Sequence, residues 1–257
     1  MRESDILTTR AAVVAQMRTL RRASERAEQG RFLLEGENAL EEALRAGLSI
    51  DKVLVDERRI NRYDNLLQQC VAWSSAPEHV IAAASEEKTP QGIVAIAALP
   101  VFAQEPTGQR LLALDAVQDP GNVGAMIRLC AAAGWDGLLL GDGCADPYAP
   151  KVVRASVGLV ARVPVWRGDL CDGISSMKRQ GYTVAVSAMD GEDFYARMRH
   201  ERLILVIGNE GRGVSERVSA LATHRWCLPM PGGAESLNAA MAAAAMVYDE
   251  VRQRRMN

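Results

Sequence analysis

The sequence predicts an α/β protein whose C-terminal part is a parallel sheet with helices on both faces. From Leu111 onward, short apolar runs alternate with longer helical patterns, as in repeated strand–helix units. The run Leu203–Ile207 is apolar throughout, as expected of a strand buried on both faces of such a sheet. Glycine-rich loops follow two of the expected strands, at the edge where open α/β sheets bind ligands.

The elements of this C-terminal part follow from its apolar runs and from the signals that start and stop helices. We expect strands at 111–116, 137–140, 163–166, 183–187, 203–207 and 225–228. We expect helices at 122–133, 149–160, 170–180, 192–200, 214–222 and 237–254.

The N-terminal region shows a second, smaller alternation of strands and helices. Residues 1–30 are typical of one or two polar helices. We then expect a strand at 32–34, a helix at 35–46 ended by Gly47, a strand at 53–55, a short helix at 77–84 and a strand at 93–97. Residues 100–109 contain two prolines and no periodicity, which indicates a linker. The expected domains are therefore 1–104 and 110–257.

The composition is that of an ordinary globular protein. The 257 residues are 48% hydrophobic and 24% charged, with a formal net charge of −2. Because there is no global basic charge, any RNA binding must come from local patches. We expect neither a secretion signal nor a membrane helix. The five cysteines are scattered and lie away from the histidines, which predicts reduced cytoplasmic thiols and no metal site.

Two loops at the expected ligand edge are rich in glycine. Residues 208–213 read GNEGRG and follow the strand 203–207. Residues 229–233 read PMPGG and follow the strand 225–228. Ser236 then stands where a helix N-cap is expected, with a long Ala-rich helix starting at about Leu237. Either loop alone is also compatible with an ordinary strand-to-helix connection.

A third segment makes the pattern more specific. The strand 111–116 is followed by DPGNVGAMIR, and the three segments together resemble the SpoU (TrmH) family of RNA ribose 2′-O-methyltransferases, in the SPOUT superfamily. The residues that match its three motifs are Asn122, Gly124 and Arg128; Gly208, Glu210 and Gly213; and Leu228, Pro229, Met230, Ser236, Leu237 and Asn238.

This resemblance implies an architecture as well as an activity. The C-terminal domain is expected to form a trefoil knot and to make a homodimer, with the site near the interface. The segments RFLLEGENALEEAL and KTPQGIVAIA resemble a substrate-binding domain with an α/β/α fold, similar to ribosomal proteins that bind kinked RNA. This added domain favours ribosomal RNA over transfer RNA as the substrate.

The implied reaction moves a methyl group from S-adenosylmethionine to a ribose 2′-hydroxyl. Arg128 is expected to stabilise developing charge on the acceptor side, or else to be a salt-bridged helix residue. Asn122 is expected at a helix N-cap, with or without contact to the ribose. Glu210 either accepts the hydroxyl proton or holds a neighbouring group. Asn238 and Ser236 resemble the polar pair near the acceptor ribose, although Ser236 is equally compatible with a plain helix cap.

The expected cofactor pocket is made largely of backbone. Its candidate residues are Ser187, Ala188, Met189, Gly208, Gly213, Leu228, Met230, Ser236 and Leu237. Because no G-x-G-x-x-G follows the first C-terminal strand, nicotinamide binding is a poor alternative.

The candidate RNA-binding residues are five arginines: Arg18, Arg21, Arg22, Arg31 and Arg154. A solvated helix face is the alternative for those near the N-terminus, and a place near the second subunit is the alternative for Arg154. Alternatives for the whole protein are a non-catalytic RNA-binding scaffold, a transfer RNA methyltransferase, and a small-molecule enzyme of the doubly wound class.

Overall fold

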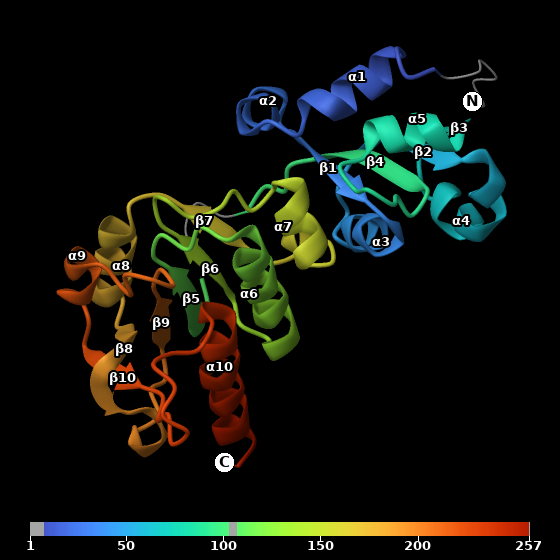
Figure 1. Cartoon of the computed structure of the whole chain (residues 1–257). Coiled ribbons are helices and arrows are strands. Elements are labelled where there is room, and N and C mark those ends of the chain that lie inside the picture. The colour runs from blue at the N-terminus through green and yellow to red at the C-terminus, as the bar shows by residue number, and fades with distance from the viewer. Residues whose placement is uncertain (1–7, 103–106, 257) are drawn as a thin grey trace. The chain divides into compact units, whose positions relative to one another are not determined.

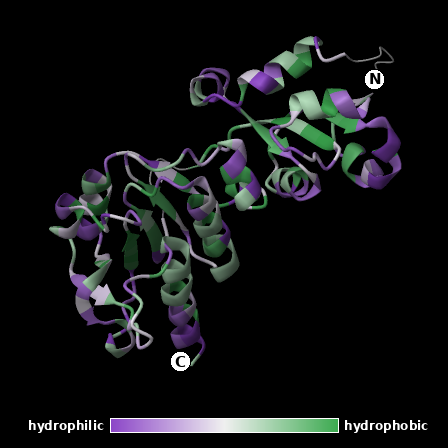
Figure 2. Cartoon of the chain, in the orientation of Figure 1, coloured by the Kyte–Doolittle hydropathy of each residue, from purple (hydrophilic) through white to green (hydrophobic). Residues whose placement is uncertain are grey.

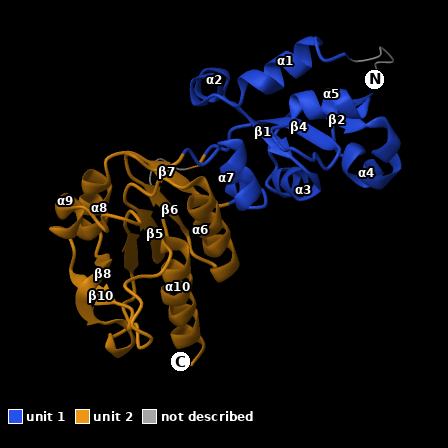
Figure 3. Ribbon diagram, in the orientation of Figure 1, with its two compact units in different colours: residues 1–101, 146–162 blue, residues 102–145, 163–257 orange. Residues whose placement is uncertain are grey.

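The computed structural model describes residues 8–102 and 107–256. Contacts divide the chain into two compact units (Figure 3). The first unit groups Met1–Val101 with Asp146–Arg162, and the second groups Phe102–Ala145 with Val163–Asn257. No helix in the described ranges is long and apolar enough to cross a membrane.

The first unit is built on a four-stranded sheet with the order β1-β4-β2-β3 (Figure 1). Its strands are β1 (Arg31–Glu35), β2 (Ile50–Asp56), β3 (Trp73–Ala76) and β4 (Ile93–Ala98). Strand β4 runs antiparallel to β1 and β2, whereas β2 and β3 are parallel. Its helices are α1 (Ala12–Thr19), α2 (Ala23–Gln29), α3 (Glu37–Arg45), α4 (Ile60–Leu67) and α5 (Glu78–Ala84), with a 3-10 turn η1 at Glu57–Arg59. Neither α4 nor β3 was expected from the sequence.

Residues 146–162 belong by contact to this first unit, although they follow the second strand expected in the C-terminal part. They contain α7 (Pro150–Ala155) and the 3-10 turn η2 (Leu159–Ala161). The ring of Tyr148 lies edge-on to that of Phe32, with the centroids 5.4 Å apart. Gly158 meets the backbone of α3 so closely that an added Cβ would lie 2.5 Å from the Cα of Ala39. The segment is therefore tied to the N-terminal sheet by packing.

The second unit is an all-parallel sheet of six strands in the order β10-β8-β9-β5-β6-β7. The strands are β5 (Arg110–Leu114), β6 (Gly137–Leu140), β7 (Val165–Arg167), β8 (Thr183–Asp193), β9 (Leu203–Ile207) and β10 (His224–Cys227). The central strands β5 and β9 are buried along their whole length, which confirms the sequence-based expectation of strands covered on both faces. Figure 2 shows these strands as apolar.

Helices cover this sheet. Helix α8 (Leu170–Arg179) and the short α9 (Glu216–Ser219) share one apolar cluster with the strands. Helix α10 (Ala239–Arg255) packs along α6 (Pro120–Ala133), beside the sheet in Figure 1. The predicted α/β class with a parallel C-terminal sheet is thus confirmed, and the trefoil knot stays a prediction.

Three local expectations were wrong. The helix expected at 192–200 is absent, because β8 continues to Asp193 and is followed by the 3-10 turn η3 (Phe194–Ala196). Asn122 is not the cap of α6: Asp119 caps it by accepting from the Asn122 backbone N–H, with Pro120 as the first helical residue. The cap of α10 is Asn238 rather than Ser236.

Candidate functional site

The three sequence motifs meet in one hydrogen-bonded chain at the carboxyl edge of the second sheet. The Asn238 side-chain nitrogen donates to the Asn122 side-chain oxygen over 3.0 Å. The Asn122 side-chain nitrogen donates in turn to the Glu210 carboxylate over 2.5 Å. We call this chain, from Asn238 through Asn122 to Glu210, the amide relay.

The amide relay has a single direction. The Asn238 side-chain oxygen caps α10 by accepting from the backbone N–H groups of Ala240 and Met241, so its nitrogen is left to face Asn122. That nitrogen requires an oxygen on Asn122, which turns the Asn122 nitrogen toward Glu210. A carboxylate only accepts, so each contact joins a donor to an acceptor. The start of α10 therefore fixes the orientation of Glu210.

The loop that carries Glu210 is held by its neighbour Asn209. The Asn209 side-chain oxygen accepts from the backbone N–H groups of Gly211 and Arg212, at 3.0 and 3.2 Å. The Asn209 nitrogen donates to the carbonyl of Ala116 over 3.0 Å. The loop folds back so that the backbone of Gly213 lies against Gly208. An added Cβ at Gly208 would lie 2.1 Å from the carbonyl carbon of Gly213, so only glycine fits at this position. Asn209 was not expected from the sequence as a site residue, although Asn side chains in turns commonly bond the backbone two residues on, as Asn209 does at Gly211.

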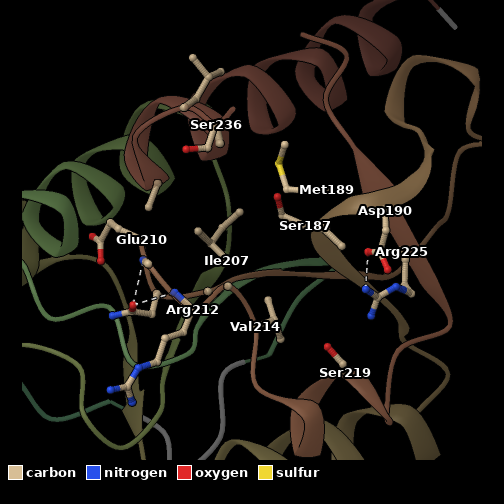
Figure 4. A pocket seen from close by; sticks show the side chains of 18 of the residues that line it. Ser187, Met189, Asp190, Ile207, Glu210, Arg212, Val214, Ser219, Arg225 and Ser236 are labelled. Carbon is tan, nitrogen blue, oxygen red and sulfur yellow. Dashed lines mark hydrogen bonds and ion pairs between the residues drawn. The ribbon is translucent and has the colours of Figure 1, made fainter. Parts of the chain in front are cut away.

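A cavity of about 530 Å³ opens beside this loop. Figure 4 shows Glu210 and Arg212 on one side of it, and Asp190 and Arg225 on the other. The expected cofactor residues that line the cavity are Ser187, Ala188, Met189, Gly208, Gly213, Ser236 and Leu237. The two others, Leu228 and Met230, are not among its lining residues, and Leu228 is buried.

Arg128 is not joined to the amide relay in the described structure. It is exposed on α6, and no described residue pairs with its guanidinium. Six residues separate it from Asn122, which corresponds to about 9 Å along the helix and about 240° around it. The two side chains therefore leave α6 in different directions, and the placement of Arg128 in the site stays a prediction.

Comparison with known proteins identifies the family. Residues 109–248 match the SpoU rRNA Methylase family, and residues 12–95 match the MRM3-like substrate binding domain. The chain belongs to the SpoU rRNA methylase family. The two matched ranges, 12–95 and 109–248, together include most of the chain.

Curated and solved relatives agree with this assignment. The Bacillus subtilis protein named 23S rRNA (guanosine(2553)-2'-O)-methyltransferase RlmP is 37% identical over 237 residues, covering 91% of this chain and 94% of its own. The SpoU methyltransferase AviRb from Streptomyces viridochromogenes, solved with AdoMet, has a TM-score of 0.85 at 28% identity and covers 96% of this chain and 99% of that one. An AdoMet-bound rRNA methyltransferase from Sinorhizobium meliloti has a TM-score of 0.85 at 27% identity, with 97% of both chains covered.

The arginines expected to bind RNA in this SpoU family member fall into two groups. Arg21 donates to the backbone carbonyls of Ala83 and Ser85, at 3.0 and 2.6 Å, and so joins α1 to the end of α5. Arg154 is ion-paired with Glu35, 3.4 Å away. These two side chains serve the packing of the first unit.

The other three arginines are more open to a ligand. Arg22 and Arg31 pair with Glu25 and Asp51 near the surface. Arg18 is exposed, and no described residue pairs with it. Arg18, Arg21 and Arg22 line a shallow hollow on α1 and the turn that follows it.

The described residues contain no cluster of His, Cys, Asp and Glu suited to a metal ion. All five cysteines are free thiols. Burial raises the pKa of the Cys130 and Cys144 thiols, which keeps them in the unreactive neutral form.

Proposed function

We propose that this chain transfers a methyl group from S-adenosylmethionine to a ribose 2′-hydroxyl of ribosomal RNA. The observation that carries the proposal is the amide relay, which joins all three family motifs and ends at Glu210 in the lining of the cavity. Membership of the SpoU rRNA methylase family supports it. The name of the Bacillus subtilis relative also supports ribosomal RNA as the substrate class.

The cavity fits the chemistry of the cofactor. Ile207, Val214 and Ala239 give it an apolar wall suited to an adenine ring, and the backbone at Gly208 and Leu237 offers donors and acceptors. S-adenosylmethionine supplies a methyl group already activated by positively charged sulfur. The residues that we propose to hold the cofactor are Ser187, Ala188, Met189, Gly208, Gly213, Ser236 and Leu237.

The acceptor side needs a group that handles the hydroxyl proton and a charge that stabilises the oxygen. We assign the first task to Glu210, because the amide relay holds its carboxylate at the cavity rim. We assign the second to Arg128, because a planar guanidinium can bind a phosphate or a developing alkoxide through two N–H groups. Asn122 and Asn238 orient Glu210. Ser236 lines the cavity and is exposed to a bound ribose.

The N-terminal unit is proposed to hold the RNA. Its match to a substrate-binding domain supports this role for the expected domain 1–104, beside a methyltransferase domain at 110–257. Arg18 is the arginine best placed to meet phosphate, because it is exposed and has no partner among the described residues. Since ribosomal RNA is the proposed substrate, we propose the cytoplasm as the place of action.

A homodimer through the second unit is part of the proposal. Large apolar side chains are exposed on α10 and just before it: Leu237 is 42% exposed, Met241 64% and Tyr248 50%. Met241 and Tyr248 are seven residues apart and so share one face of the helix. An exposed apolar face of this kind is typical of an interface. Sedimentation of the purified chain tests this point, with Met241→Glu expected to shift the equilibrium toward monomer.

The whole function is tested by mapping 2′-O-methyl groups in total RNA from cells with and without this gene. We expect one ribosomal position to lose its methyl group and to regain it with the wild-type gene, but not with Glu210→Gln. Loss of a transfer RNA mark instead would contradict the substrate class. An unchanged methylation map with intact RNA binding would favour a non-catalytic scaffold.

A further inference from the structure

Strand β8 departs from regular pairing where it reaches the cavity. Its neighbour β10 pairs Arg225 with Val186, and the next residue, Trp226, pairs with Glu192. One step along β10 therefore corresponds to six steps along β8, and residues 187–191 have no partner in β10. We call these residues the β8 bulge.

The β8 bulge forms one wall of the cavity. Four of its five residues line the cavity: Ser187, Ala188, Met189 and Asp190. Met189 and Asp190 are well exposed there, which leaves them available to a bound molecule. The shape of this wall therefore depends on how the bulge is held.

Two contacts with Arg225 hold the bulge. The Arg225 guanidinium donates to the Asp190 carboxylate over 2.5 Å, as Figure 4 shows. Gly191 passes so close to β10 that an added Cβ would lie 2.5 Å from the Arg225 carbonyl oxygen. A side chain at position 191 would push the end of the bulge away from β10. The guanidinium beside Asp190 also lowers the pKa of that carboxyl.

We infer that Arg225 and Gly191 are positioning residues for the cofactor, acting through the β8 bulge. This inference rests on the proposed function, because it takes the cavity as the S-adenosylmethionine site. Arg225 lines the cavity, but its guanidinium donates to the Asp190 carboxylate, so its action on the cofactor runs through the bulge. The effect of both residues is to keep Ser187, Ala188 and Met189 at the surface of the cavity.

The test measures the affinity of the full chain for two ligands by calorimetry. One is S-adenosylmethionine, and the other is 5′-methylthioadenosine, which lacks the amino-acid end. Arg225→Gln should weaken both ligands by the same factor, roughly twofold to fivefold, because an exposed ion pair contributes little. Gly191→Ala should weaken both by roughly tenfold or more, because backbone must move. The charge-swapped double variant Asp190→Arg with Arg225→Asp should recover part of the loss.

A matched control is Arg217→Gln, which removes the exposed Arg217–Asp169 ion pair of the same unit, outside the cavity lining. This variant should bind both ligands like the wild type. If Arg225→Gln weakens only S-adenosylmethionine, the pair recognises the amino-acid end directly and the positioning role is overturned. Unchanged affinities in Arg225→Gln and Gly191→Ala also overturn it. If the wild type binds neither ligand, the proposed function falls as well.

Discussion

The direction of the amide relay makes Asn238→Asp an informative substitution. Aspartate is a helix cap as good as asparagine, and its negative charge suits a helix N-terminus. The backbone bonds to Ala240 and Met241 should therefore survive. A carboxylate has no donor for the Asn122 oxygen, however. The Asn122 amide then lies between two carboxylates, and its nitrogen can donate to only one of them at a time, so Glu210 shares its donor with position 238.

The expected loss follows from the single bond that disappears. A hydrogen bond to a charged group contributes roughly 1.5–3 kcal/mol. Because Glu210 and Asn238 are exposed, water replaces part of this contribution, and we expect the lower end of the range. With roughly 1.4 kcal/mol for each factor of ten, turnover should fall about tenfold. The melting temperature should stay close to that of the wild type, since the helix cap is retained. Single-turnover kinetics on a defined RNA and a thermal melt measure the two quantities.

A second substitution tests whether the relay is one chain. Glu210→Gln supplies a donor at the far end, so Glu210→Gln with Asn238→Asp completes the chain in the reverse direction. The double variant should be more stable than the sum of the single changes predicts, although positions 210 and 238 meet only through Asn122. It should remain inactive, because the carboxylate is gone. Additive unfolding free energies, or normal turnover in Asn238→Asp, would refute the reasoning.

Three further predictions concern arginines and one buried carboxylate. Arg128→Ala should leave cofactor affinity intact and lower turnover about a hundredfold, with partial recovery in Arg128→Lys; near-normal turnover at saturating cofactor would remove its catalytic role. Arg21→Ala should lower the free energy of unfolding by roughly 1–3 kcal/mol, because the carbonyls of Ala83 and Ser85 lose their donor. Arg18→Ala should leave the free energy of unfolding unchanged, weaken RNA binding and make that binding less dependent on salt. Burial alone would raise the pKa of Asp249, but hydrogen bonds from Arg197 and Arg252 lower it below 3.8. Asp249 should therefore contribute stability above pH 3.8 that is lost as the pH falls through the lower pKa of the folded state, and denaturant titrations of Asp249→Asn should lack this acid loss.

The sequence predicted the second sheet well because its signal is local. Strands β5 and β9 are apolar runs, and burial on both faces requires such runs. The meeting of Asn122, Glu210 and Asn238 was also predictable in outline, since the carboxyl ends of parallel strands share one edge. The donor and acceptor order of the relay was not, because it depends on which residue caps α10.

The helix expected at 192–200 shows how a distant contact overrides a local pattern. The side chain of Arg197 is buried against the Phe194 ring, with its guanidinium carbon 3.5 Å from the ring centroid. It pairs with Asp249 and Glu250 of α10, at 2.8 and 2.7 Å. These carboxylates are about fifty residues away in sequence, so no local pattern reveals them. The β8 bulge was equally hidden, because it exists only as a jump in pairing with β10.

The packing of residues 146–162 changes how the RNA-binding role must be tested. Removing residues 1–104 would be the simple way to separate RNA binding from cofactor binding. That deletion also removes Phe32, Glu35 and Ala39, which contact Tyr148, Arg154 and Gly158 of the remaining chain. The truncated chain would then expose an apolar segment and an unpaired arginine between β6 and β7. Weakened cofactor binding in such a protein would report damage to the sheet. Point changes such as Arg18→Ala leave this packing in place, and so they isolate the contribution of the N-terminal unit to RNA affinity.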